Sequence, residues 1–295
     1  MNVGQAELAS LSRMFSAAVL RELGRHGQSQ LLARLLHQSS IPERVGARAT
    51  IGDAFERAFA TLRSLGNRDE YVYRSAITQK ILLGQHSLRT ASMVGEARVG
   101  MCKADVVVFN GTSTAYEIKS ERDSLSRLHN QVTSYGRVFA AVNVVTSPKH
   151  LPQVLERVPG DVGVLVLSER FTLRTERAAV ADPGRTDPLA VLDFVRANEA
   201  AAILHACGID APRVPNTQLR SRLRDIFATL DAAQVHQGMV SVLRKTRSQS
   251  ALADSLPSIP MSLRAAMLTL KMDNASRTRV HDATLLPVGA ALAWS

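Results

Sequence analysis

Apolar positions recur at three- and four-residue spacing through the first part of the chain, beginning with Leu8, Leu11, Phe15 and Val19. This spacing is typical of helices that bury one face. We therefore expect two helices within residues 5–38, with a break near 24–27. Two more are predicted over 51–65 and 69–83, and the segment that starts at Ile41 reads as a linker.

From residue 88 the pattern changes to a period of two, which predicts strands. We expect strands over 88–99, 104–109 and 114–119. The last two are joined by Asn110-Gly111, a strong signal for a tight hairpin. The sequence therefore predicts three consecutive strands in one sheet.

Helices and strands then alternate. Asp123 and Ser124 supply cap chemistry for a helix that reaches about residue 139. Apolar runs predict strands over 141–146 and 162–167, the second being the last clear strand, with a short helix opened by Pro148 between them. This order predicts a mixed α/β fold, with helices packed on a central sheet.

Strand signals fade beyond residue 175, where a turn-rich linker is expected at 181–188. The segments after it predict helices over 189–207, 218–232, 235–246 and 261–271. Thr217 is expected to cap one of these helices, and residues 285–294 to form a packed tail. We expect three regions: an N-terminal helical region (1–66), a core (67–175) and a basic, mainly helical C-terminal region (176–295).

The charge of the chain narrows the class of partner. The formal net charge is +10, and residues 211–280 carry eleven Arg and Lys against four Asp. A basic excess favours a polyanion such as nucleic acid, although a soluble protein with many surface arginines would show the same composition. The two cysteines are far apart, and we find neither a secretory signal nor a membrane span. We therefore expect a cytoplasmic protein without a membrane partner.

Residues 103–119 carry the most informative chemistry. Asp105 heads one apolar strand, and Glu117 and Lys119 lie two residues apart on the next, so their side chains share a face. Two carboxylates and the backbone carbonyl of Ile118 are hard oxygen ligands of the kind that Mg²⁺ or Mn²⁺ prefers. Lys119 could hold an attacking water or stabilise charge on a phosphate. The alternative is that Glu117 and Lys119 are solvent-facing charges on an edge strand.

The neighbouring elements add candidate residues. Gln131 and Tyr135 lie four residues apart on the following helix, so they share a face beside the hairpin. A further acidic ligand is expected upstream, from either Glu96 or Glu70. We prefer Glu96 on position alone, because a carboxylate in the first turn of a helix, such as Glu70, is favoured by the helix dipole.

At these residues the chain resembles the PD-(D/E)XK nuclease superfamily. The matching elements are Asp105, then Glu117-Ile118-Lys119, then Gln131-x-x-x-Tyr135, within residues 69–168. Ala104 stands where many members have proline. The pattern E-I-K-S-x-x-D-x-L-x-R-L at 117–128 is similar to that of an uncharacterised bacterial branch.

This resemblance implies a restriction-endonuclease-like core and Mg²⁺-dependent cleavage of DNA. Asp105 and Glu117 would be metal ligands, Lys119 the catalytic lysine, and Gln131 and Tyr135 would support the site or the substrate. Defence, repair and mobile-element processing all use such a core. The alternative is a catalytically inactive nucleic-acid-binding or regulatory protein that keeps the fold, and a homodimer is left open.

Overall fold

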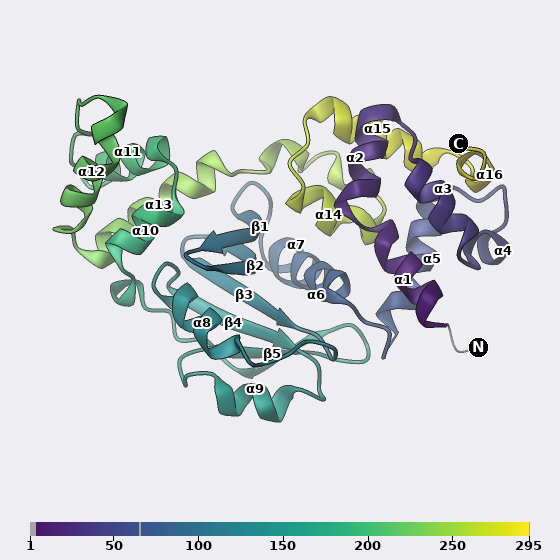
Figure 1. Cartoon of the computed structure of the whole chain (residues 1–295), viewed down its shortest axis with the longest axis horizontal. Coiled ribbons are helices and arrows are strands. Elements are labelled where there is room, and N and C mark those ends of the chain that lie inside the picture. The colour runs from purple at the N-terminus through teal and green to yellow at the C-terminus, as the bar shows by residue number, and fades with distance from the viewer. Residues whose placement is uncertain (1–3, 65, 295) are drawn as a thin grey trace. The chain divides into compact units, whose positions relative to one another are not determined.

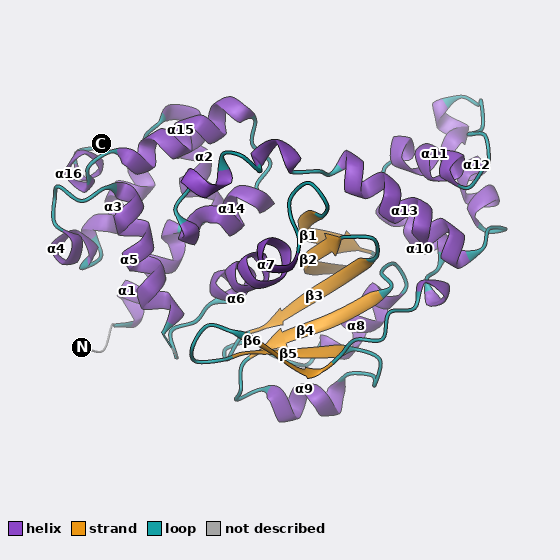
Figure 2. Cartoon of the chain, turned by 180° about the vertical axis from the view of Figure 1, so that it is seen from behind, coloured by secondary structure: helices purple, strands orange, loops and turns teal. Residues whose placement is uncertain are grey.

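A six-stranded mixed sheet lies at the centre of the chain, in a computed structural model that describes residues 4–64 and 66–294. The strands are β1 (Ser92–Val99), β2 (Cys102–Phe109), β3 (Ser113–Lys119), β4 (Ala141–Thr146), β5 (Gly163–Leu167) and β6 (Leu173–Arg177), in that spatial order. β3, β4 and β5 are parallel, and the other neighbours are antiparallel. The predicted mixed α/β class, with a sheet flanked by helices, is confirmed (Figures 1 and 2).

Contacts divide the chain into two compact units. One joins Met1–Gln79 to Leu252–Ser295, and the other is Lys80–Ala251. The sheet belongs entirely to the second unit, whereas the first is built from the two terminal segments. The three consecutive regions expected from the sequence stay a prediction about domains.

The hairpin of β2 and β3 forms as expected. Val106 to Phe109 pair with Tyr116 to Ser113 in register. Gly111 in the connection has φ 104°, a conformation that costs glycine little because it lacks a Cβ atom. β1 starts at Ser92, later than predicted. β6 was not predicted, because its exposed residues Arg174, Thr175 and Glu176 give no apolar period.

The helices of the second unit are α7 (Leu83–Gln85), α8 (Leu128–Gly136), α9 (Leu151–Arg157), α10 (Pro188–Phe194), α11 (Ala197–Ala206), α12 (Asn216–Phe227) and α13 (Ala232–Thr246). A continuous apolar cluster joins residues of α8 and α10–α13 to one face of the sheet, with Val107, Ala115 and Tyr135 among its members. Figure 1 shows α8 against the strands on this side. α8 is thereby held beside β3.

Several predicted boundaries in this unit are wrong. α8 begins at Leu128, because the Asp123 carboxylate accepts hydrogen bonds from the backbone N–H and hydroxyl of Ser120 and closes a turn there. α9 begins at Leu151, after Pro148. The helix expected over 189–207 is two helices, because Arg196 is extended at the start of α11. Thr217 lies inside α12 and does not cap it.

The first unit is helical. Its helices are α1 (Gln5–Met14), α2 (Ala17–His26), α3 (Gln30–His37), α4 (Ile41–Val45), α5 (Ile51–Arg63), α6 (Glu70–Ile77), α14 (Arg264–Thr269), α15 (Asn274–Leu285) and α16 (Val288–Leu292). A five-residue π-helical segment, η1 (Thr78–Leu82), follows α6, and its residues from Lys80 onward belong to the second unit.

Some of these helices also differ from those predicted from the sequence. Residues 5–38 hold three helices instead of two, because the Ser16 side chain caps α2. The expected linker at Ile41 is the short helix α4. The helix predicted over 261–271 is confined to α14, and α15 had not been predicted. None of the helices in the described part of the chain is long and apolar enough to cross a membrane.

Candidate functional site

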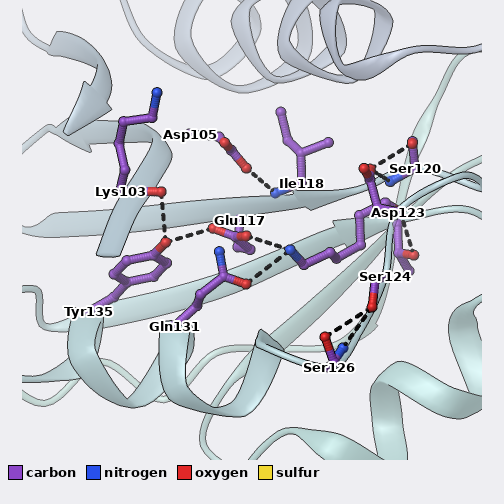
Figure 3. Close-up of polar contacts among 12 residues, drawn as sticks. Lys103, Asp105, Glu117, Ile118, Ser120, Asp123, Ser124, Ser126, Gln131 and Tyr135 are labelled. Carbon is purple, nitrogen blue, oxygen red and sulfur yellow. Dashed lines mark hydrogen bonds and ion pairs between the residues drawn. The ribbon is translucent and has the colours of Figure 1, made fainter. Parts of the chain in front are cut away.

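The candidate site lies where β2 leaves its pairing with β3. Val106 and Tyr116 are the last paired residues, and the register places Asp105 opposite Glu117 one position further on. The Oδ2 atom of Asp105 accepts a hydrogen bond of 2.6 Å from the backbone N–H of Ile118 (Figure 3). The hairpin therefore holds both carboxylates at one end of β3.

Lys119 and Glu117 form a buried ion pair at this end. The Lys119 Nζ atom lies 2.7 Å from Glu117 Oε1, and the two side chains are only 8% and 2% exposed. The same Nζ atom donates to Gln131 Oε1 of α8 at 3.0 Å. The pair does share a face, as the two-residue spacing predicted, and this face is turned toward α8 and away from solvent.

Tyr135 completes the network from the next turn of α8. Its hydroxyl lies 2.8 Å from Glu117 Oε2 and 2.8 Å from the backbone carbonyl of Lys103. A tyrosine has one hydroxyl proton, so it donates to one of these acceptors at a time. Burial and then the Glu117 charge raise the pKa of Tyr135 far above its usual value. Tyr135 therefore stays a neutral donor toward Glu117.

The two candidates for a further acidic ligand each form an ion pair with a basic side chain. Glu96 lies 2.9 Å from Lys103 Nζ in an ion pair whose side chains are both more than half exposed. Glu70 pairs with Arg74 within α6, in the other unit. Among residues 4–64 and 66–294, no three His, Cys, Asp or Glu side chains gather as metal ligands. Asp105 and Glu117 are thus brought together without Glu96.

The oxygen atoms at this end of β3 are of the chemical type that binds a hard divalent cation. Asp105, Glu117 and the carbonyl of Ile118 offer only oxygen, as Mg²⁺ prefers. The Lys119 ammonium already provides a positive charge at Glu117. A cation bound by Glu117 would therefore compete with Lys119 for the same carboxylate.

Two supporting contacts had not been predicted. The carbonyl of Lys103 accepts from Tyr135, and the Thr146 hydroxyl donates to the carbonyl of Lys119 at 2.9 Å. Backbone acceptors leave no signal in the residue types. Thr146 could have been found from the parallel pairing of β3 and β4, which sets it beside Lys119.

Comparison with known proteins matches the chain to a family of phage proteins. The family model described as bacteriophage P4 protein cII matches residues 64–258, which is more than half of the chain. The curated relative "Protein cII" of Enterobacteria phage P4 is 32% identical over 111 residues, a stretch that covers 36% of this chain and 41% of that relative. The match thus spans less than half of the relative's length.

A solved protein of unknown function from Silicibacter pomeroyi is also similar in structure. It has 19% identity and a TM-score of 0.29, over 41% of this chain and 82% of that protein. This similarity is too low to support an argument about fold or site. The extent of the family match is sufficient by itself: the chain belongs to the family of bacteriophage P4 protein cII.

Proposed function

We propose that this protein is a divalent-metal-dependent nuclease that hydrolyses phosphodiester bonds of DNA. The observation that supports this proposal most is the arrangement at the end of β3. Asp105 is anchored to the backbone of Ile118, and Glu117 and Lys119 are buried together and held by Gln131 and Tyr135. A buried network of charged groups is costly to build for structure alone.

In this proposal each residue has a distinct task. Asp105, Glu117 and the carbonyl of Ile118 would hold Mg²⁺ or Mn²⁺. A bound divalent ion lowers the pKa of water and polarises a phosphoryl oxygen. The Lys119 ammonium orients the attacking water or stabilises charge on the phosphate. Tyr135 and Gln131 are positioning residues, since they contact Glu117 and Lys119 through hydrogen bonds.

The substrate class is inferred from charge. Arg220 and Arg224 of α12 share the carboxylate of Asp193, so part of the basic excess is neutralised. Arg244 and Lys245, at the end of α13, are exposed and have no ion pair with any residue that the structure describes. Phosphate contacts of this kind make binding salt-dependent and insensitive to sequence. We place this activity in the cytoplasm, consistent with two cysteines that are not bonded to each other.

A second candidate is a nucleic-acid-binding or regulatory protein without catalysis. The specific observation in its favour is the ion pair of Lys119 with Glu117, which neutralises the buried carboxylate without any metal. The two candidates make different predictions about metal binding. A nuclease must bind Mn²⁺ through Glu117, whereas a binding protein need not.

The decisive experiment is a cleavage assay on labelled linear, circular, single-stranded and branched DNA and on RNA, with Mg²⁺, Mn²⁺ or EDTA. We expect cleavage of DNA with metal, and its loss in Asp105→Asn and Lys119→Met. Asp105→Asn keeps an oxygen that can accept from Ile118, so the hairpin should survive. Lys149→Met, an exposed lysine of the same unit, is the matched control for Lys119→Met.

Full cleavage by both site variants would refute the assignment. Mn²⁺ binding to the wild type and to Glu117→Gln then separates the two candidates. Weak binding, equal in both proteins, together with absence of cleavage, would favour the binding protein.

A further inference from the structure

An open pocket of about 480 Å³ lies on the sheet, on the face opposite to Glu117. Thr114 and Tyr116 of β3 and Asn143 of β4 line it, and Glu117 follows Tyr116 on the other face of the same strand. Lys80 and Gln85 form one wall, and residues from Thr172 onward form another. All lining residues belong to the unit Lys80–Ala251, and the volume is in the range of small-molecule sites.

The pocket has a positive charge and no negative one. Lys80 is the one charged residue among those that line it. Its ammonium lies 5.9 Å from the centroid of the Phe171 ring and forms no ion pair with a carboxylate in the described part of the chain. Four threonines add neutral hydrogen-bond donors, at positions 112, 114, 172 and 175. This set of donors suits an anion with several acceptor oxygens.

Tyr116 supplies a further hydrogen-bond donor at the pocket. Its side chain is buried to all but 6% and lines the pocket, yet no residue from 4–64 or 66–294 hydrogen-bonds its hydroxyl. Burial raises the pKa of Tyr116 far above its usual value, so the hydroxyl keeps its proton. The hydroxyl is accessible to solvent in the pocket, so it can donate a hydrogen bond to an acceptor on a ligand there.

The remaining lining is apolar and small, with Ala141, Leu165 and Leu173 beside the amide of Asn143. Such a surface accommodates an uncharged body that carries a few hydrogen-bonding groups. We propose that this pocket binds a small organic phosphate of nucleotide size. The phosphate contacts Lys80 and the threonine hydroxyls, and the body lies over Tyr116 and Asn143. This inference does not depend on the proposed nuclease activity, because no residue of the candidate site lines the pocket.

The test is isothermal titration calorimetry of the full chain in EDTA. The probes are the four common deoxynucleoside 5′-monophosphates, with deoxyadenosine and inorganic phosphate as fragments. We expect at least one monophosphate to bind more tightly than either fragment. Lys80→Met should weaken it about tenfold, as expected for losing a charged hydrogen bond, and Tyr116→Phe about fivefold.

Two controls locate the binding. Lys149→Met removes an exposed lysine outside the pocket and should leave the affinity unchanged. Asp105→Asn should also leave it unchanged, which distinguishes this pocket from the candidate nuclease site. The proposal is overturned if none of the monophosphates binds, if a fragment binds as tightly as they do, or if binding survives Lys80→Met and is lost in Asp105→Asn.

Discussion

Lys119→Met tests the central claim that Glu117 needs a positive charge beside it. The substitution keeps most of the side-chain volume and removes the bond of 2.7 Å to Glu117 and that of 3.0 Å to Gln131. Both bonds have the Lys119 ammonium as donor, so each is charge-assisted and contributes about 2 kcal/mol. The sum of about 4 kcal/mol agrees with the cost of about 3–5 kcal/mol for leaving a buried charge unpaired.

The double variant Lys119→Met/Glu117→Gln removes the charge that Lys119 balances. We expect it to recover about 2 kcal/mol of the loss, because the neutral amide leaves no uncompensated charge at this position. Excess Mn²⁺ should stabilise Lys119→Met more than the wild type, because Lys119 no longer competes for Glu117. A ligand at one hundred times its Kd adds about 2.7 kcal/mol.

Amide hydrogen exchange of peptides from β3 and β4 is the suitable measurement. The single tryptophan, Trp294, lies in the other unit, so its fluorescence does not report on the sheet. Lys149→Met is the control and should change protection by less than about 0.5 kcal/mol. Unchanged protection in Lys119→Met, or an equal effect of Mn²⁺ on the wild type and on Glu117→Gln, would refute the reasoning.

Three further predictions follow from the same unit. Arg247→Met should destabilise this unit by about 3–5 kcal/mol, because Glu199, only 1% exposed, would lose its charged partner. Burial raises the pKa of Glu199, but its hydrogen bonds and ion pair with Arg247 help to bring that pKa down to about 2. Urea unfolding followed by circular dichroism measures the loss of stability. Burial lowers the pKa of His236 to about 4, so below pH 6.5 the unfolded chain binds a proton at this residue more readily than the folded one. The stability of the unit should therefore be unaffected by His236 above pH 6.5 and fall by up to about 3 kcal/mol as the pH drops to 4. The loss of stability should be smaller in His236→Gln. Glu96→Gln should change stability by less than about 1 kcal/mol and leave Mn²⁺ binding intact, because its pair with Lys103 is exposed.

A different result would contradict each of these three predictions. A cost below about 1 kcal/mol for Arg247→Met would mean that Glu199 is solvated or protonated when its partner is removed. An equally steep pH profile in His236→Gln would assign the acid sensitivity to other groups. Weaker Mn²⁺ binding by Glu96→Gln would restore the role of metal ligand that the sequence predicted for Glu96.

Local pattern was sufficient for the part of the site that lies within single elements. Period two placed Glu117 and Lys119 on one face, and the four-residue spacing placed Gln131 and Tyr135 on one face of a helix. Asn110-Gly111 set the hairpin and hence the approach of Asp105 to Glu117. These inferences succeed because a strand and a helix each have a fixed side-chain period.

The predicted boundaries of helices and strands were wrong where a side chain hydrogen-bonds to a group other than the expected one. Asp123 has the residue type of a helix cap, but its carboxylate is occupied by Ser120, and α8 starts five residues later. β6 is an exposed strand, recognisable only from its pairing with β5. Several backbone groups compete for such side chains, and residue type alone does not decide which one wins.

The sequence by itself determined the mixed α/β class, the hairpin and the faces that carry the charged residues, because these follow from short-range periodicity. Only the tertiary structure decided that α8 binds β3 through Tyr135 and Gln131, that Glu96 pairs with Lys103, and that the two terminal segments form one unit. Contacts between distant segments depend on how apolar faces pack together, and many packings satisfy the same local pattern.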